Sequence, residues 1–178
     1  MTVAPEGPAG SPADVKALRK ALGTFATGVT VVTVGGPTPH GMTANSFASV
    51  SLDPPLVLVC VDRAAVMHNV LLPTEHFGVS VLGGDQEKVA RHFATKWRGL
   101  GAPEFETVDW LPGPVTRVPL ISGAIAYFEC ELWRGYDGGD HTIFLGRVLS
   151  LRRQDGDGAL LFFGGQFRRL EPLPMTGS

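Results

Sequence analysis

Short polar side chains crowd one segment of this sequence directly before an apolar run. In GMTANSFASVSLDPPLVLVC, Gly41 to Cys60, five of them stand within nine residues: Thr43, Asn45, Ser46, Ser49 and Ser51. Small side chains let a ligand approach the backbone, where hydroxyl and amide N–H groups can bind a ring edge, a polyol chain or a phosphate. The same composition suits an exposed strand with a polar outer face, because serine and threonine are usually exposed. Composition alone leaves both interpretations open, and the surface strand is the simpler one.

Two further segments carry groups that could handle charge. Arg91, His92, Phe93 and Lys96 fall in one predicted helix, where the cations form a solvated face or else bind a phosphate. The closing run FFGGQFRR (162–169) combines aromatic rings, glycines and two arginines. Its simpler interpretation is a final strand with a basic end.

His141 is the histidine whose position is most suggestive. It follows a Gly-Gly-Asp turn within YDGGDHTIFLGRV (136–148) and begins a predicted strand, so we expect it at the rim of a barrel. From the residues alone, a solvated histidine paired with Asp140 is the simpler interpretation.

Several common site types have no support in the sequence. It contains neither G-x-G-x-x-G before a helix nor the G-x-x-x-x-G-K-[ST] loop, so any nucleotide must be held in another way. No serine stands in G-x-S-x-G, which leaves hydrolase chemistry unsupported. We expect no metal site, because no H-x-x-x-H pair occurs among the five histidines: His40, His68, His76, His92 and His141.

The bulk properties indicate one globular domain. The chain has 178 residues, of which 44% are hydrophobic and 18% charged, with a net charge of -2. Nothing in this balance favours nucleic acid or an anionic membrane as a partner. Cys60 and Cys130 stand in apolar runs and are expected to be reduced core residues. With no signal peptide and no apolar run of about 18 residues, we expect a soluble, cytoplasmic protein.

The pattern of elements predicts a mainly β fold with a few helices. A helix is expected from a cap near Ser11, with an apolar stripe of Val15, Leu18, Leu22 and Phe25. A second is expected over 84–97 with Asp85 as its cap, and a short one over 68–73. Roughly seven strands are expected over 29–34, part of 41–52, 56–61, 77–82, 123–133, 141–151 and 159–165.

Short turns join most of these strands, so they should pair antiparallel in a closed or nearly closed barrel. A loop is expected from Gly99 to Pro119. The predicted organisation is a flexible tail over 1–14, one domain over 15–172 and a C-terminal tail over 173–178.

The segments taken together resemble the flavin reductase-like family. The resemblance is carried by FATGVTVVT, GMTANSFASVSLDPPLVLVCVDR, GDHTIFLGRV and LLFFGGQFRRL, and it covers the chain from about Val15 to Leu170. It implies an antiparallel FMN-binding split β-barrel, a homodimer, and reduction of FMN or FAD by NADH or NADPH. The reduced flavin would then pass to a separate flavin-dependent monooxygenase.

The resemblance also implies which residues form the site. His141 would lie beside the nicotinamide as the catalytic or positioning residue. Cofactor-binding positions would be Thr43, Ala44, Asn45, Ser46, Ser49, Val50, Ser51, Cys60, Val61, Asp62, Arg63, Arg91, His92, Phe93, Lys96, Phe163, Gly164, Gly165, Gln166 and Phe167. Two positions depart from the family pattern. His92 replaces a common arginine, and Phe163 and Phe167 lack the tyrosine hydroxyl often found in the closing segment.

Three other functions remain as alternatives. The same barrel could carry a pyridoxamine-phosphate oxidase-like enzyme, although the GDH segment does not support one. A non-catalytic flavin-binding protein would share the polar segment while leaving His141 idle. A purely structural barrel would bind no flavin.

Overall fold

The computed structural model describes residues 11, 13–95, 100–155 and 158–170. In this part of the chain the α-helices are α1 (Val15–Leu22), α2 (Val66–Leu71) and α3 (Glu87–Ala94), with a 3-10 helix η1 (Ala102–Phe105). The strands are β1 (Thr27–Gly28), β2 (Thr30–Val34), β3 (His40–Ala44), β4 (Ala48–Leu52), β5 (Pro55–Asp62), β6 (His76–Val81), β7 (Trp110–Pro112), β8 (Pro119–Ile121), β9 (Ala126–Gly138), β10 (His141–Arg153), β11 (Ala159–Phe163) and β12 (Gln166–Leu170).

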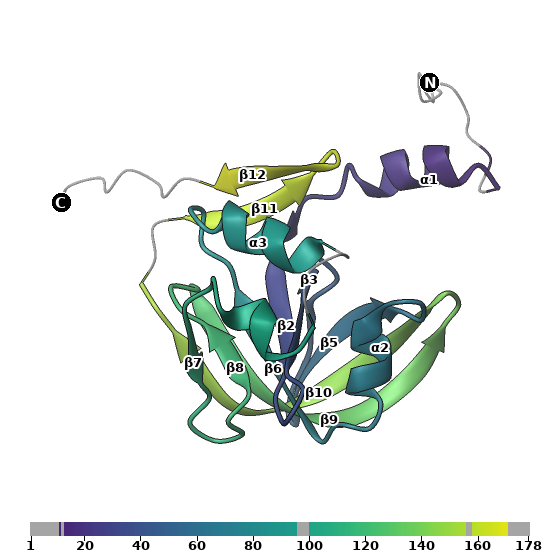
Figure 1. Cartoon of the computed structure of the whole chain (residues 1–178). Coiled ribbons are helices and arrows are strands. Elements are labelled where there is room, and N and C mark those ends of the chain that lie inside the picture. Colours follow the sequence, from purple (N-terminus) through teal and green to yellow (C-terminus); the bar gives the residue numbers. More distant parts are fainter. Residues whose placement is uncertain (1–10, 12, 96–99, 156–157, 171–178) are drawn as a thin grey trace.

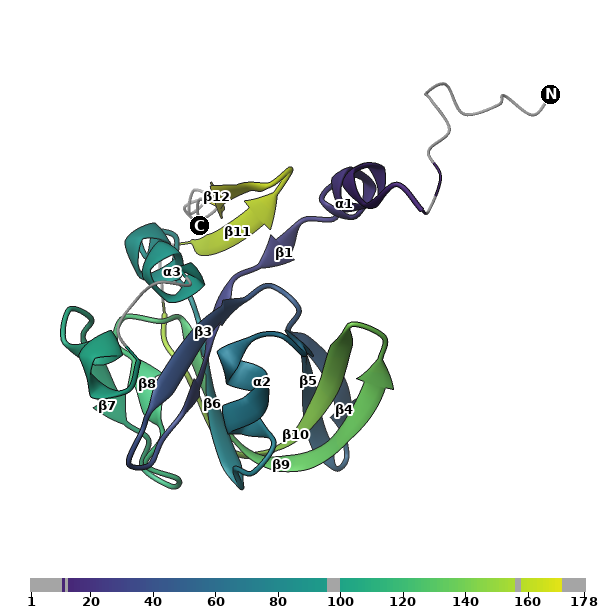
Figure 2. The same ribbon diagram turned by 45° about the vertical axis from the view of Figure 1, so that its right-hand side comes forward.

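The main sheet has seven strands in the order β3-β2-β6-β9-β10-β5-β4, and every neighbouring pair is antiparallel. The sheet curls until β3 comes into contact with β5, but no ladder joins the two edge strands β3 and β4 within the described residues. Helix α2 lies in the opening and contacts both β3 and β5 (Figure 2). The mainly antiparallel split-barrel prediction is confirmed, and the barrel is open.

Strand β2 is buried along its whole length, which explains its run of β-branched residues. Val32 and Val34 face the interior of the curled sheet, while Val31 belongs to a second core on the opposite face. The two threonines of this strand are buried as well, and each has a partner. Thr30 donates its hydroxyl to the carbonyl of Ala44 at 2.9 Å, and the Thr33 hydroxyl donates to a carbonyl of the β8 strand.

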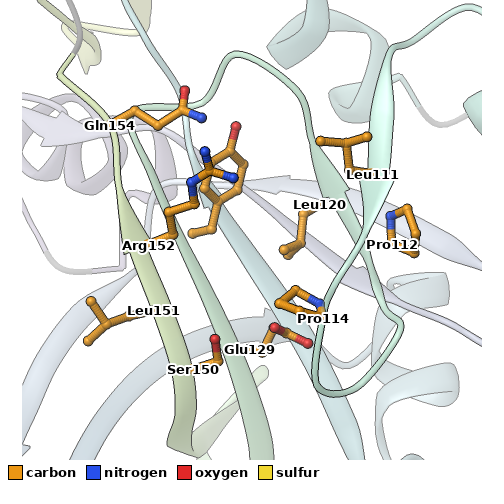
Figure 3. A pocket seen from close by; sticks show the side chains of 10 residues that line it. Leu111, Pro112, Pro114, Leu120, Glu129, Ser150, Leu151, Arg152 and Gln154 are labelled. Carbon is orange, nitrogen blue, oxygen red and sulfur yellow. The ribbon is translucent and has the colours of Figure 1, made fainter.

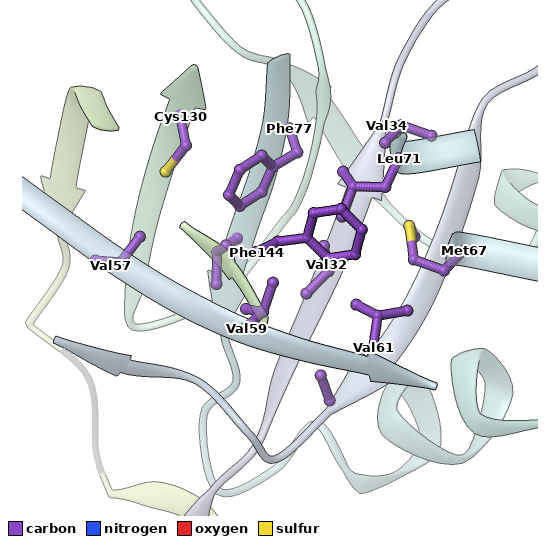
Figure 4. Packing of buried hydrophobic residues seen from close by; sticks show 12 residues of the cluster. Val32, Val34, Val57, Val59, Val61, Met67, Leu71, Phe77, Cys130 and Phe144 are labelled. Carbon is purple, nitrogen blue, oxygen red and sulfur yellow. The ribbon is translucent and has the colours of Figure 1, made fainter. Parts of the chain in front are cut away.

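The first core fills the inside of the curled sheet (Figure 4). Phe77 and Phe144 are its largest side chains, and α2 contributes Met67 and Leu71. The second core joins α3 and the small β1-β11-β12 sheet to the back of β2, and its members include Phe93, Phe105 and Leu160 (Figure 1). The first core holds β3 through Ala44, and the second holds α3 through Ala90 and Phe93.

Helix α1 differs from its prediction in two respects. Its N-cap is Asp14, whose carboxylate accepts from the N–H groups of Lys16 and Ala17, so Ser11 is not the cap. The predicted apolar stripe is present, but it contacts no core in this chain: α1 has no buried residue, and Leu22 is 66% exposed. In the described residues, no helix combines the length and apolar character needed to cross a membrane.

Helix α3 is shorter than predicted, and its cap was assigned to the wrong residue. Gln86, not Asp85, occupies the N-cap position. Its buried amide accepts from the N–H of Gly83 and donates to the carbonyl of Ser122, so it anchors the helix to the loop before β9. Beyond the C-cap Thr95, the predicted helix runs into residues outside the described part of the chain.

The remaining corrections concern short elements. The described residues contain twelve strands rather than roughly seven, because β1, β4, β7, β8 and β12 are brief or were merged with their neighbours. The predicted loop from Gly99 to Pro119 includes η1 and β7. The predicted short helix near 68–73 is confirmed as α2, shifted toward the N-terminus.

Candidate functional site

A cavity of about 350 Å³ opens where β3, the end of β5, α2 and α3 meet. Three of the predicted site residues line it: Thr43 from β3, Asp62 from β5 and Phe93 from α3. The rest of its lining is mostly apolar and was not predicted: His40, Met42, Ala64, Ala65, Val66, Met67, Ala94 and Leu100. The structure therefore brings together residues from three predicted segments that are separated by up to 50 positions (43 to 93).

The cavity wall formed by β3 presents backbone as well as side chains. Strand β3 pairs with β2 on one side only, and the N–H of Gly41 points the other way, to a carboxylate oxygen of Glu104 at 3.1 Å. N–H directions alternate along a strand, so the N–H of Thr43 also points away from β2. The Thr43 hydroxyl donates to the carbonyl of Ala90 at 2.6 Å, which fixes β3 against α3. A methyl group on Gly41 would stand 2.5 Å from the ring of Phe93, so this position requires glycine.

A buried carboxylate supports the same wall, and sequence reasoning did not find it. Glu104 of η1 is 1% exposed, and one of its oxygens lies 2.5 Å from Nδ1 of the cavity-lining His40. The carboxylate also accepts from the N–H groups of Gly41 and Gly101. His92 bonds through Nε2 to the carbonyl of Glu104 at 2.7 Å. The imidazole of His92, which departs from the family pattern, therefore anchors η1 and is not directed at a ligand.

The polar segment after β3 uses its central hydroxyl internally. Ser46 accepts from the N–H of Cys60 and donates to the carbonyl of the same residue, at 3.0 and 2.9 Å. This pair of hydrogen bonds fixes the bend after β3 to β5. Ala44 is buried, whereas Asn45 is exposed at the bend. Burial raises the pKa of the Cys60 thiol, and both cysteines are free.

Ser49, Val50 and Ser51 lie farther from the cavity than the resemblance implied. They belong to the edge strand β4, where Ser49 pairs with Val57 and a register shift follows. None of the three is among the cavity-lining residues, and Val50 is 45% exposed. Val61 is buried in the core next to the cavity-lining Asp62. The contribution of the β4 residues to a ligand site stays a prediction.

His141 lies on the strand next to the one that carries the cavity-lining Asp62. It is the first residue of β10 and pairs in register with Asp62 of β5. Its Nδ1 lies 2.7 Å from the carboxylate of Asp140, and this hydrogen bond is the main reason that the pKa of Asp140 is lowered. The His141 side chain is 40% exposed, so it is accessible at the rim as predicted.

Arg63 fixes the turn that carries His141. Its N–H donates to the carbonyl of Asp140 at 3.0 Å, and its guanidinium lies 3.2 Å from the carboxylate of Asp137. Arg63 therefore joins the end of β5 to the β9–β10 turn. This contact uses its charge within the protein, which weakens its assignment as a cofactor-binding residue.

Arg91, one of the two predicted phosphate-binding cations in this region, is not among the residues that line the cavity. Arg91 is exposed, pairs with Glu87 at 2.7 Å, and stacks 5.0 Å above the ring of Phe167. The arginine thus links α3 to β12. Lys96 lies outside the described residues.

The closing hairpin turns at two glycines with left-handed backbone. Gly164 and Gly165 have φ angles of +59° and +77°, as the turn between β11 and β12 requires. Phe163 and Gln166 flank the turn and are exposed. The N–H of Gly164 donates to the carbonyl of Gly23, which ties the end of α1 to this turn.

A second cavity, about 110 Å³ in volume, lies between the β7–β8 hairpin and strands β9 and β10 (Figure 3). No predicted site residue lines it. Its acidic group, Glu129, is buried and accepts from the N–H groups of Val115 and Thr116 and from the Thr116 hydroxyl. This carboxylate therefore holds a loop in place, and the larger cavity is the better candidate for a ligand.

Comparison with known proteins agrees with the resemblance. Residues 22–171 match the family model described as the flavin reductase like domain. The chain belongs to this family. It is 54% identical over 170 residues to an NADH-dependent FAD reductase of Streptomyces globisporus, covering 96% of this chain and 93% of that protein.

Two further relatives are components of two-protein systems. The chain is 34% identical over 160 residues to the reductase subunit of a flavin-dependent monooxygenase of Rhodococcus jostii, covering 89% of this chain and 80% of that protein. Among solved structures, the flavin reductase component of a bacterial two-component tryptophan halogenase superposes with a TM-score of 0.87. That structure is 54% identical, and the match covers 90% of this chain and all of that one.

Proposed function

We propose that this chain is an NADH-dependent flavin reductase that supplies reduced flavin to a partner oxygenating enzyme. The observation that carries the proposal is the cavity that unites Thr43, Asp62 and Phe93, with His141 one strand pair away. The names of the relatives supply the donor and the acceptor, NADH and flavin. An enzyme is favoured over a non-catalytic flavin-binding protein, because the His141 side chain is partly accessible and pairs in the sheet with the cavity-lining Asp62.

The cavity fits the ring system of a flavin. Its volume of about 350 Å³ lies within the usual range for small-molecule sites, roughly 300–1,000 Å³. Apolar side chains such as Met42, Met67 and Phe93 suit the faces of an isoalloxazine, and the outward N–H of Thr43 suits a polar ring edge. The charged groups of the lining suit a flavin phosphate less well, because they include the carboxylate of Asp62. We infer that the ring enters this cavity and that the phosphate lies outside it.

The residues of this chain would perform binding and orientation. A bound flavin supplies the hydride acceptor, and hydride transfer itself requires no side-chain acid or base. Thr43 and Phe93 would fix the ring against β3 and α3. His141, held in one orientation by Asp140, would position the nicotinamide at the rim. Positioning of this kind is the main contribution a protein makes to such a transfer.

We further propose that the protein acts as a homodimer. Large apolar side chains are exposed on strands of the main sheet: Leu52 of β4 is 94% exposed and Leu151 of β10 is 66% exposed. Helix α1 also presents an apolar stripe that no core of this chain covers. Association of two copies would remove such surfaces from water. Sedimentation equilibrium tests this proposal, and a monomer that retains full activity would contradict it.

The decisive experiment for the catalytic proposal is an assay of NADH oxidation with FMN, FAD and riboflavin added in turn. We expect oxidation only when a flavin is present, together with quenching of flavin fluorescence at micromolar protein. When a flavin-dependent monooxygenase is added, NADH oxidation should be accompanied by oxidation of the monooxygenase's own substrate. A protein that binds flavin without oxidising NADH would instead be a flavin carrier.

A further inference from the structure

A strongly basic pocket lies between α1 and the β11–β12 turn, apart from the cavity described above. Its volume is about 490 Å³, and its lining comprises Val15, Lys16, Arg19, Lys20, Gly23 and the glycines of the turn. Figures 1 and 2 both place α1 beside this turn, and the hydrogen bond from Gly164 to the carbonyl of Gly23 fixes the two together. Of the residues that line it, only Gly164 and Gly165 are among the predicted cofactor-binding positions, and no role has been assigned to the three cations.

The charges of the pocket are not neutralised within the described part of the chain. Lys16, Arg19 and Lys20 line it with no acidic residue among the described lining residues. Lys16, Arg19 and Lys20 stand at positions i, i+3 and i+4, which places all three on one face of α1. No carboxylate of the described residues lies within ion-pair distance of any of the three. A solvated basic face would carry the same charges, and what distinguishes this one is the turn that faces it across the pocket.

The opposite wall exposes backbone. Gly164 and Gly165 have positive φ angles, and a methyl group at either would meet nothing within 4 Å, so the space beside them is open. The N–H of Gly164 donates to the carbonyl of Gly23, so the backbone donor that this wall offers to an anion is the N–H of Gly165. Cations on one wall and bare backbone on the other form a combination that suits phosphate oxygens, with the Arg19 guanidinium able to bind two of them at once.

An electrostatic effect links Arg19 of this pocket to the turn that carries His141. The pKa of Asp140, lowered mainly by its hydrogen bond with His141, is lowered further by the charge of Arg19. Arg19 is therefore within electrostatic range of the turn that carries His141. In a nicotinamide dinucleotide, one ribose separates the reactive ring from the pyrophosphate, and each phosphate carries a negative charge.

We propose that Lys16, Arg19 and Lys20, facing the Gly164–Gly165 turn, bind the pyrophosphate of a dinucleotide. The donor NADH is the favoured source, and FAD is the other dinucleotide of the reaction. This inference rests on the proposed function, since it takes its ligands from that reaction. It assigns a binding role to α1, a helix that sequence analysis treated only as an apolar stripe.

The test compares ligands with and without a pyrophosphate in a variant that lacks two of the cations. Arg19→Gln/Lys20→Gln keeps helix propensity nearly constant. The matched control is Arg153→Gln, which removes an exposed cation at the opposite end of β10 from His141. With FMN as acceptor, the double variant should raise the KM for NADH roughly 2- to 30-fold, as the loss of two solvent-accessible ion pairs implies. The KM for reduced nicotinamide riboside, which has no phosphate, should not change.

A second arm identifies the source of the pyrophosphate. With reduced nicotinamide riboside as donor, a rise in the KM for FAD but not for riboflavin would keep the site and assign it to the flavin. Equal rises for the donors with and without pyrophosphate, or no change in any KM, would overturn the proposal.

A binding measurement separates this inference from the catalytic proposal. ADP-ribose carries the pyrophosphate but no nicotinamide, so its binding requires no turnover. Isothermal titration should show weaker binding to the double variant than to the wild type or Arg153→Gln. Equal affinity for all three proteins would reject the pocket, whereas a wild type that binds ADP-ribose but oxidises no NADH with added FMN would reject only the reductase activity.

Discussion

The buried carboxylate of Glu104 provides a sharp test of how the cavity wall is held. Replacement by glutamine keeps the shape of the side chain but turns one acceptor oxygen into an N–H donor. If the new amide faces Gly41, one backbone donor loses its acceptor; if it faces His40 and Gly101, two donors lose theirs. Either orientation leaves a buried donor unsatisfied and sets two donors against each other.

The cost follows from burial. Glu104 is 1% exposed, so water cannot replace the lost acceptor. One unsatisfied buried group costs about 1–3 kcal/mol. For a chain of this length, 1 kcal/mol corresponds to a melting shift of about 2–4 °C, so Glu104→Gln should melt roughly 2–12 °C lower. Because His40 lines the cavity and bonds to Glu104, flavin affinity should fall as well.

The assay pairs thermal unfolding with a flavin fluorescence titration. Glu106→Gln is the matched control: it makes the same chemical change two positions away on an exposed side chain. It should shift the free energy of unfolding by no more than about 0.5 kcal/mol. A Glu104→Gln protein that is as stable as this control and binds flavin equally well would refute the argument.

Four other predictions follow from individual residues. His141→Ala should raise the KM for NADH or lower kcat roughly 2- to 13-fold, the loss of one hydrogen bond, with flavin affinity unchanged by titration. In the same variant the pKa of Asp140, measured by NMR, should rise toward its ordinary value. In the wild type, the Asp140–His141 pair stabilises the folded state at pH values above the unfolded-state pKa of Asp140. This stability is lost as the pH falls through the lowered pKa of the folded state. Gly41→Ala should destabilise the protein and weaken flavin binding, since its methyl would stand 2.5 Å from the Phe93 ring; equal melting temperatures would contradict this. Cys130, whose pKa is raised to about 12 by burial and then by Glu129, should not react with a thiol reagent at pH 8 until the protein is unfolded.

The sequence predicted those helices and strands whose pattern lies within one continuous segment. The β-branched run at 29–34 became β2, and its burial on both faces explains why polar residues do not alternate along it. The cap of α3 was missed because Gln86 bonds to Ser122, 36 positions away. The partnership of His40 with Glu104 spans 64 positions and leaves no periodic trace in the sequence. Contacts of this kind are set by packing between elements, which a single sequence does not display.

The polar segment does contribute to the cavity, but its hydroxyl groups have a different role from the one predicted. Its hydroxyls were expected to face a ligand, yet Thr43 donates to Ala90 and Ser46 bonds twice to Cys60. Both residues therefore hold β3 and the following bend in place while keeping side-chain bulk low. The segment contributes small side chains and outward backbone N–H groups to the cavity. These N–H groups can bind a ligand only if the edge strand that carries them is held rigidly. A short hydroxyl side chain meets both needs, because it ties the strand to its neighbours without filling the space in front of it.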